Sequence, residues 1–372
     1  VVARARLGFH FLRAHARLAA ASSSPIVVSW TITERAATSE LDLTVDNAPS
    51  HINRPPWRNV VRIALPDRWT AETRSWDGIL CVELAPCSYA LVNPLSAART
   101  VVPAPALRED ERRCFVRGYI AGAYSHPVTG IFHPLHCTSQ ATGRSPRAIC
   151  LRLLRVDGAS ASAWREIPMS ADADTATLQT TAGHNFCASS ATVHGRLHWR
   201  DMLRGQKELL VFDTVKEESG SMPLPQQLAG DTVVVQQTIT TMSGKLCLLL
   251  GLAERTVEVW VLEDYRAQEW WLRQRLLAAG NTPLHTVCPS SYLGNVGLIT
   301  AEDRVEKMVF CNGWRWKVYD VRRESSRSEE LDFRSGIAIH TESPAPHDVV
   351  FGAAPTRGVA LSSHPNPNNN VA

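Results

Sequence analysis

The sequence predicts an all-β fold, and its internal repeats favour a β-propeller of about six to eight four-stranded blades. Short apolar or alternating runs recur from residue 25 onward and are separated by Gly, Pro, Asp and Asn. Two kinds of run alternate with a unit of about 40–50 residues, which is typical of a propeller blade. Strands do not alternate with long helical patterns, so a doubly wound sheet is not expected. A sandwich or a barrel stays open, because hairpins in any β protein produce similar runs.

Most of the predicted strands are four to eight residues long and rich in Val, Ile, Leu and aromatic residues. They occupy residues 26–32, 60–65, 79–84, 90–92, 149–156, 209–212, 233–239, 246–250, 257–262, 305–310 and 317–321. Segment 263–279 contains many helix-forming residues, but its apolar positions fit neither a helical nor a strand period. We expect a strand, a turn and a second strand there.

The repeat has two forms, and each is marked by a characteristic turn. In the first form a glycine precedes an apolar strand, as at Gly78, Gly195 and Gly244. In the second form an apolar strand ends in a polar residue, as at Asp213 and Asp264. The glycines predict tight turns with positive φ angles, which glycine adopts without a steric penalty.

The charge of the chain is concentrated at its N-terminus. The whole chain of 372 residues has a formal net charge of +3, and its first 33 residues carry four arginines and no carboxylate. The remainder therefore has a net charge of −1. A near-neutral body lacks the overall positive charge of a general nucleic-acid binder, so no nucleic-acid partner is expected.

The cysteines indicate a reducing compartment. The chain has nine cysteines without any Cys-x-x-Cys pair, and it contains no Asn-x-Ser/Thr sequon. Most cysteines are therefore expected to be small buried apolar residues of a cytoplasmic or nuclear protein. The longest strongly apolar run, 246–252, is far shorter than the roughly 20 residues that span a bilayer, so no membrane partner is expected.

The two ends of the chain differ from its body. In residues 1–24, Leu7, Phe11, Ala14 and Leu18 fall on one face of a short amphipathic helix. The same arginine-rich, acid-free composition also describes an organelle transit peptide. Residues 345–372 are rich in Pro and Asn and are expected to be a disordered tail. Residues 25–344 would then form the propeller.

An ordered set of motifs resembles the F-box-associated propeller domain of plant F-box proteins. The matching stretches are WDGILC at 76–81, LVNP at 91–94, YSHPVTGIF at 124–132, SAWREIP at 162–168, SATVHGRLHW at 190–199, LVFD at 210–213 and VEVWVLEDY at 257–265. They follow the family's order from about residue 76 to residue 319. There are three departures from the family's motifs. His126 stands where the family has Asp, His194 stands where it has Asn, and His133-Pro134 interrupts the strand after the turn. These departures put local turn geometry in doubt.

The resemblance implies the substrate-recognition subunit of an SCF-type, cullin–RING ubiquitin ligase, which holds a protein target for ubiquitination and degradation. The F-box itself is not present, and the FLRAH stretch at 11–15 resembles the helix that follows it. The resemblance therefore implies that the chain starts just after the F-box, which favours a docked helix over a transit peptide. A Skp-type adaptor would be a partner only if an F-box precedes Val1.

Other functions stay open on the sequence alone. They are a propeller-fold hydrolase, a sugar-binding propeller, and a degenerate gene copy without an F-box. A hydrolase would need carboxylates or metal ligands that converge at the mouth of the channel. Because the resemblance implies a mouth without them, we expect a non-catalytic protein, whose target and binding loops the sequence does not identify.

The possible metal ligands have more ordinary interpretations. His133, His136 and Cys137 lie on or beside one predicted strand, with no fourth ligand at a recognisable spacing. His194 and His198 have the spacing of zinc ligands on a helix, but on a strand they would lie about 13 Å apart. We expect His198 to pack between blades.

Asp172 and Asp174 resemble the start of a calcium loop that lacks its glycine and its final glutamate. The sequence has no nucleophile elbow and no phosphate-binding loop. We therefore assign no catalytic, cofactor-binding or metal-binding residue, and no cofactor. Most of the tryptophans are expected in the core between blades, and one or two could line a recognition surface.

Overall fold

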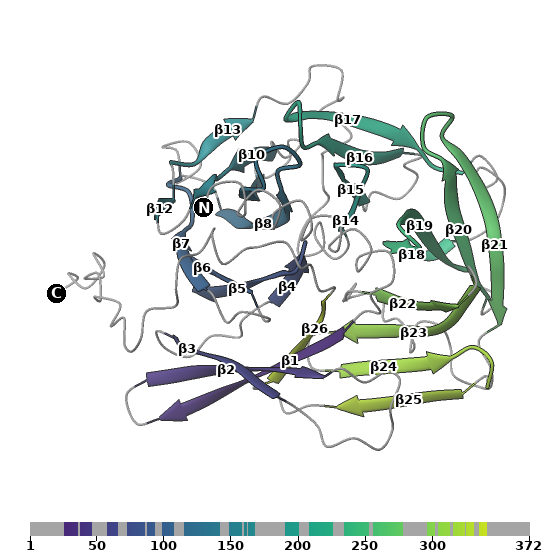
Figure 1. Cartoon of the computed structure of the whole chain (residues 1–372), viewed down its shortest axis with the longest axis horizontal. Coiled ribbons are helices and arrows are strands. Elements are labelled where there is room, and N and C mark those ends of the chain that lie inside the picture. The colour runs from purple at the N-terminus through teal and green to yellow at the C-terminus, as the bar shows by residue number, and fades with distance from the viewer. Residues whose placement is uncertain are drawn as a thin grey trace, which may run out of the picture.

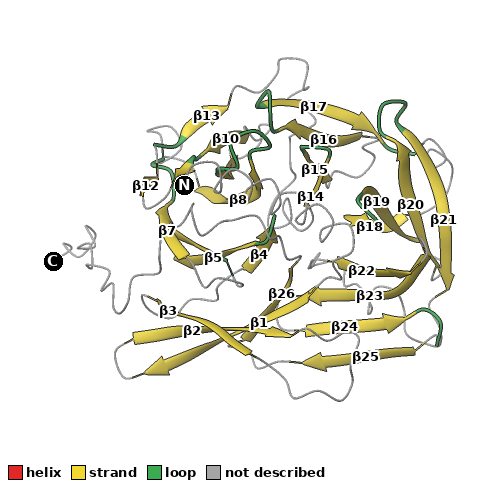
Figure 2. Cartoon of the chain, in the orientation of Figure 1, coloured by secondary structure: helices red, strands yellow, loops and turns green. Residues whose placement is uncertain are grey.

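The computed structural model describes the strands and turns that form the body of the chain. The described residues are 26–35, 38–46, 58–65, 73–85, 88–93, 99–107, 115–141, 149–157, 160–161, 163–167, 190–200, 208–225, 234–252, 256–277, 296–301, 304–312, 315–323, 325–330 and 335–340. The helix predicted within 1–24 and the tail predicted at 345–372 lie outside them. Within the described residues every regular element is a strand (Figure 2).

The described strands form six antiparallel sheets that stand around a common centre as the blades of a propeller (Figure 1). Blade 1 contains β26 (Ser335–His340), β1 (Ile26–Arg35), β2 (Thr38–Asp46) and β3 (Arg58–Leu65). Blade 2 contains β4 (Thr73–Trp76), β5 (Ile79–Ala85), β6 (Ser88–Val92) and β7 (Arg99–Pro103). Blade 3 contains β8 (Phe115–Ser125), β9 (Phe132–Ala141), β10 (Ile149–Leu153), β11 (Val156–Asp157), β12 (Ser160–Ala161) and β13 (Arg165–Ile167).

The remaining blades have four strands each. Blade 4 contains β14 (Ser190–Val193), β15 (Arg196–Arg200), β16 (Glu208–Asp213) and β17 (Glu218–Pro223). Blade 5 contains β18 (Val234–Met242), β19 (Lys245–Leu252), β20 (Thr256–Asp264) and β21 (Glu269–Leu277). Blade 6 contains β22 (Val296–Ala301), β23 (Arg304–Asn312), β24 (Arg315–Asp320) and β25 (Ser325–Glu330). The predicted β-propeller is thus confirmed.

The ring closes through blade 1, which joins the two ends of the described chain. Strand β26 pairs with β1, so the last described strand completes the sheet that the first three begin. The inner strands are in contact in the order β26, β4, β8, β14, β18 and β22. Closure leaves no blade without neighbours on both sides, which protects the sheet faces from solvent.

Tight turns that contain glycine join the first two strands of three blades. Asp77 and Gly78 have φ angles of 45° and 77°, and His194 and Gly195 have φ angles of 51° and 70°. The pair at Ser243 and Gly244 has the same left-handed geometry. Two consecutive positive φ angles match the twist of an antiparallel hairpin. The positive φ angles predicted for the glycines are confirmed.

The core consists of apolar side chains between adjacent blades. Trp199 and Phe212 of blade 4 pack against Tyr124 and Leu135 of blade 3. Between blades 4 and 5 the corresponding large residue is Trp260. Alternation along each strand directs successive side chains toward the two flanking blades, which explains why the buried runs of the sequence are nearly continuous.

Three details of the predicted elements can be compared with the structure. The strand–turn–strand expected at 263–279 is confirmed, because β20 ends at Asp264 and β21 begins at Glu269. The single strand predicted at 149–156 is wrong in one respect, since Leu154 and Arg155 separate β10 from β11. The interruption expected at His133-Pro134 is also wrong, because β9 runs through Pro134. The carbonyl oxygen of Pro134 accepts a hydrogen bond from the backbone N–H of Leu154 at 3.1 Å. Proline therefore deprives the strand of one backbone N–H donor but not of its acceptor.

Four tryptophans expected in the core are buried, Trp164 is half-buried, and one is exposed. Trp76, Trp199, Trp260 and Trp270 are buried, whereas 60% of the Trp271 side chain is exposed on the outer strand of blade 5. Three cysteines of the described core, at 81, 137 and 247, are buried, in agreement with their predicted role as small apolar residues. Among the described residues no helix is long and apolar enough to cross a membrane.

Candidate functional site

Two turns of neighbouring blades come together at one end of the ring. The first connects β8 to β9 in blade 3, and the second connects β16 to β17 in blade 4. The ring centroids of His126 and His133 are 5.6 Å apart, and Nδ1 of His133 lies 4.0 Å from a carboxylate oxygen of Glu217. These contacts link the turns across the blade boundary. Residues 126–130 and 213–217 are called the paired turns below.

The blade 4 turn is closed by an aspartate at its first position. Oδ1 of Asp213 accepts hydrogen bonds from the backbone N–H groups of Val215 and Lys216, each at 3.0 Å. The N–H of Glu217 donates to the Asp213 carbonyl oxygen at 2.8 Å. Glu217 itself has a φ angle of 57°. Such a side-chain cap satisfies backbone donors that the turn would otherwise leave to solvent.

The blade 3 turn has the same arrangement with a histidine in place of the aspartate. Nδ1 of His126 accepts from the N–H groups of Val128 at 3.3 Å and of Thr129 at 3.2 Å. The N–H of Gly130 donates to the His126 carbonyl oxygen at 2.8 Å, and Gly130 has a φ angle of 74°. The doubt about turn geometry at His126 is therefore resolved, because the imidazole takes the place of the carboxylate.

The tips of the paired turns expose apolar side chains. Val128 is 71% exposed and Val215 is 56% exposed, and both follow the capping residue by two positions. Isolated exposed valines are ordinary, but two on adjoining and hydrogen-bonded turns form a pre-ordered surface. Lys216, which follows Val215, is also exposed.

Below the tips, a polar cluster holds blades 3 and 4 together. Arg165 of β13 forms an ion pair with Glu217. Nδ1 of His133 lies 3.2 Å from the hydroxyl oxygen of Tyr124. Burial, together with the neighbouring His126, Arg155 and Arg165, lowers the pKa of His133 to about 4. Burial raises the pKa of Tyr124, so both groups are neutral at pH 7.

The histidines with zinc-like spacing occupy the next blade boundary. The rings of His194 and His198 both make edge contacts with Tyr265 of blade 5, at centroid distances of 5.1 and 5.6 Å. The guanidinium of Arg196 lies over the same ring at 5.4 Å. His198 is fully buried between blades, which confirms its predicted packing role. His194 has a φ angle of 51°, so it occupies a left-handed turn position of the kind that asparagine, aspartate and histidine adopt more readily than other non-glycine residues.

The three residues considered as metal ligands do not converge. His133 faces blade 4, whereas His136 packs against Tyr89 of blade 2, with ring centroids 5.8 Å apart. Cys137 lies in the core between blades 3 and 4. Alternation places His136 on the face opposite to His133 and Cys137, and those two are four strand residues, about 13 Å, apart. In the described part of the chain no three His, Cys, Asp or Glu residues are placed to hold a metal. Asp172 and Asp174 lie outside it.

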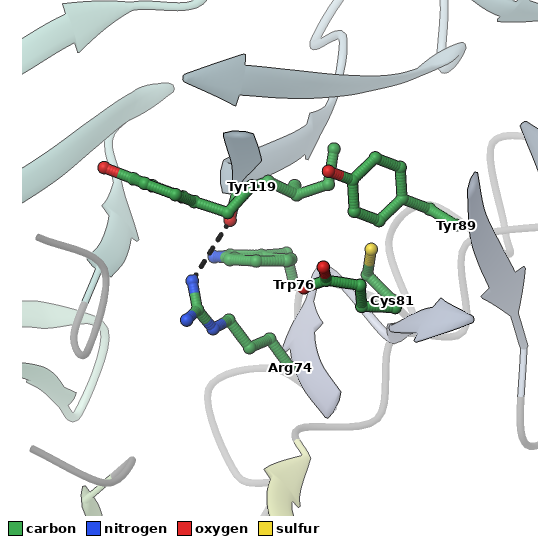
Figure 3. A pocket seen from close by; sticks show the side chains of 7 residues that line it. Arg74, Trp76, Cys81, Tyr89 and Tyr119 are labelled. Atoms are coloured by element: carbon green, nitrogen blue, oxygen red, sulfur yellow. Dashed lines mark hydrogen bonds between the residues drawn. The ribbon is translucent and has the colours of Figure 1, made fainter. Parts of the chain in front are cut away.

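A small pocket lies between blades 2 and 3 (Figure 3). Its volume is about 230 Å³ with its open mouth included, and its lining residues are Arg74, Trp76, Cys81, Glu83, Tyr89, Tyr119 and Ile120. The Arg74 guanidinium donates to the Ile120 carbonyl oxygen at 3.2 Å and lies 6.0 Å from the Tyr119 ring centroid. The enclosed part of the pocket is about 10 Å³, far below the roughly 300 Å³ of small-molecule sites, and its polar groups have intramolecular partners. This pocket does not compete with the paired turns as the candidate site.

The sequence did not predict the paired turns as a site, although each turn carries one sequence signal. The His126 departure marked the blade 3 turn, and the Leu-Val-Phe-Asp stretch marked the start of the blade 4 turn. The two turns are about 85 residues apart in sequence and meet only because their blades are neighbours. A local sequence pattern does not indicate such a long-range contact.

Comparison with known proteins gives one sequence relative and several distant structures. No family model matches the chain. Over 81 residues the chain is 28% identical to the F-box protein CPR1 of Arabidopsis thaliana. This similarity covers 21% of the chain and 20% of that protein, so the chain matches about a fifth of the length of this curated relative.

Among solved structures, the chain is similar to the β-propeller domain of Cps50 (Swd1) from Myceliophteria thermophila, at 11% identity and a TM-score of 0.36. That similarity covers 81% of this chain and 85% of the other. It is also similar to PpgL, a periplasmic gluconolactonase of Pseudomonas aeruginosa, at 10% identity and a TM-score of 0.37, with 85% and 99% covered. At such identities the likeness concerns architecture and not activity.

Proposed function

We propose that this chain is a protein-recognition propeller and that the paired turns form part of its recognition surface. The observation that carries the proposal is the exposure of Val128 and Val215, at 71% and 56%, on turns that are hydrogen-bonded into fixed shapes. Ordered apolar side chains bind a protein partner without the entropy cost of first ordering a loop. Such anchors are effective when polar groups surround them.

We further propose that the chain is an F-box-associated propeller, the substrate-recognition part of an SCF-type ubiquitin ligase receptor in a plant. The ordered motifs between residues 76 and 319 support this, as does the 28% identity over 81 residues to an Arabidopsis F-box protein. Such a receptor performs no bond chemistry. It holds a target close to the ubiquitin-loaded enzyme and so raises the effective concentration of the target's lysines. Its place would be the cytoplasm or the nucleus.

The proposal can be tested by joining a heterologous F-box to the N-terminus of the chain and expressing the fusion in plant cells. Proteins recognised by the propeller should gain ubiquitin-modified lysines and fall in abundance, and cullin inactivation should reverse both effects. The double variant Val128→Asp and Val215→Asp should lose most of these changes, because a carboxylate at each tip prevents apolar burial. Ubiquitin-remnant proteomics measures the modified lysines, and quantitative proteomics of the same samples measures the abundance of each protein.

A matched control is available on another blade. Val101 on the outer strand of blade 2 is 43% exposed, so Val101→Asp introduces a charge at a comparable surface valine away from the turns. This variant should keep the full set of ubiquitinated proteins. Equal loss in the control and in the double variant would contradict recognition by the paired turns. A fusion that assembles with the adaptor and the cullin but changes no protein's ubiquitination would contradict the receptor role.

A further inference from the structure

We propose that the blade 3 turn is a proton-responsive element, in which proton uptake at Nδ1 of His126 releases the turn that displays Val128. The matching blade 4 turn, which is closed by Asp213, would stay in place over the same pH range. The release itself is a property of the fold. Its effect on a bound partner rests on the function proposed above.

The geometry imposes a strict requirement on the His126 ring. Its Nδ1 accepts two backbone N–H groups, at 3.3 and 3.2 Å. A ring nitrogen accepts hydrogen bonds only while it carries no proton. If Nδ1 were protonated, its own N–H would point at the backbone N–H groups of Val128 and Thr129, and none of the three could accept a hydrogen bond from another. The turn conformation and the charged imidazole are therefore mutually exclusive.

A carboxylate in the same place has no such limit above about pH 4. Asp213 makes both equivalent bonds at 3.0 Å, and Asp264 repeats them in the β20–β21 turn at 2.8 and 2.9 Å. Hydrogen bonds to backbone N–H groups lower the pKa of Asp213 and that of Asp264, which keeps them ionised. Of these three similar turns, the blade 3 turn is the one closed by an imidazole, whose Nδ1 can accept the two backbone N–H groups only while it carries no proton.

The surroundings of His126 do not replace the lost bonds. Its own turn contains Pro127, Val128, Thr129 and Gly130, none of which is titratable. The ring that faces it from β9 is His133, which burial keeps neutral by lowering its pKa to about 4.

The other charged and titratable groups near this site contact or surround His133 rather than His126. They are Tyr124, Arg155, Arg165 and Glu217. Glu217, the carboxylate of this set, is paired with Arg165. A proton on His126 therefore meets a neutral ring and two arginines rather than an available counter-charge. The partly exposed ring already reaches solvent, so solvent stabilises the charged form once Nδ1 leaves the two backbone N–H groups, and the capping bonds are lost.

The test compares two amides in the same molecule. The protein is labelled with ¹⁵N-valine, and amide exchange of Val128 and of Val215 is measured between pH 8 and pH 5. Each of these residues follows its capping side chain by two positions, so Val215 is an internal reference. After correction for intrinsic exchange rates, the protection of Val128 relative to Val215 should fall about tenfold across this range, which corresponds to the loss of roughly one hydrogen bond.

His126→Asp supplies the decisive variant, because it installs the carboxylate that closes the blade 4 turn. In this variant the ratio of the two protections should become independent of pH, and the rest of the amide spectrum should be unchanged. Parallel behaviour of Val128 and Val215 in the unaltered protein would overturn the proposal. A tenfold fall that persists in His126→Asp would also overturn it, because another group would then be responsible. No partner is present in this experiment, so its failure leaves the receptor proposal intact and is distinguishable from failure of that proposal.

Discussion

Nε2 of His198 lies 2.7 Å from the hydroxyl oxygen of Tyr265 and joins a buried ring of blade 4 to the β20–β21 turn of blade 5. The other nitrogen, Nδ1, lies 3.2 Å from the carbonyl oxygen of Ala191. A carbonyl oxygen can only accept, so Nδ1 carries the proton and Nε2 accepts from the tyrosine hydroxyl. The ring is thus neutral and fully bonded, in agreement with its burial.

Removal of the Tyr265 hydroxyl should destabilise the propeller. In Tyr265→Phe the buried Nε2 of His198 loses its donor, and an unsatisfied buried acceptor costs about 1–3 kcal/mol. The free energy of unfolding, measured by urea denaturation at pH 7.5, should fall by that amount. Arg266→Ala in the same turn changes an exposed side chain and is the control. Equal midpoints for the two variants would contradict the structural role of the hydroxyl.

Acidification should destabilise the protein before its carboxylates titrate. Burial lowers the pKa of His133 and of His198 to about 4, from an ordinary value of 6.5. Between these values the unfolded chain binds protons at both residues and the folded chain does not, so stability falls as pH falls from about 6.5 to 4. Below about pH 4 this contribution levels off.

The urea midpoint at pH 7.5 and at pH 5.0 measures this effect. The midpoint should be lower at pH 5.0, and His198→Gln, which keeps hydrogen-bonding groups without titrating, should show a smaller difference between the two pH values. A midpoint that does not change, or that rises on acidification, would contradict the assignment of both rings as neutral.

Much of the fold follows from local patterns, whereas the candidate site depends on contacts between blades. Runs such as 246–250 identify strands because buried β segments are continuous and apolar, and the glycine at 244 identifies a left-handed turn. The sequence did not predict the break at Leu154 and Arg155, because the buried Leu154 continues the apolar run of β10 toward Val156. The exposed valines and the His133–Glu217 contact could not be predicted, since only ring closure brings these turns together.

Two tryptophans clamp outer strands to the preceding blade in the same way. Nε1 of Trp164 donates to the carbonyl oxygen of Pro103 at 2.8 Å, and Nε1 of Trp270 donates to that of Pro223 at 3.1 Å. Phenylalanine in either place keeps most of the apolar contact and loses the donor. Because Trp270 is buried, we expect Trp270→Phe to lower the unfolding free energy by about 1–2 kcal/mol. Trp164 is half-buried, so Trp164→Phe should cause a smaller loss.

Thermal denaturation of the two variants beside the exposed control Trp271→Phe checks this order. Trp271→Phe should melt within about 1 °C of the unaltered protein, because surface substitutions away from packed features change stability little. An effect of Trp271→Phe as large as that of Trp270→Phe would contradict the clamp.

Gly122 allows blades 3 and 4 to approach closely. A Cβ atom at this position would lie 3.0 Å from Cζ2 of Trp199 and 3.2 Å from a methyl carbon of Leu197. The indole has little freedom to retreat, because Nε1 of Trp199 donates to the Ala121 carbonyl oxygen at 2.6 Å and the ring is buried. Gly122→Ala should therefore lower the unfolding free energy by about 1–3 kcal/mol. Gly220→Ala on β17, where an added Cβ meets no atom within 4 Å, is the matched control and should be neutral or slightly stabilising. If urea denaturation gave the same stability for both alanine variants, the indole would not be fixed by its hydrogen bond, and the contact between these blades would be looser than its geometry implies.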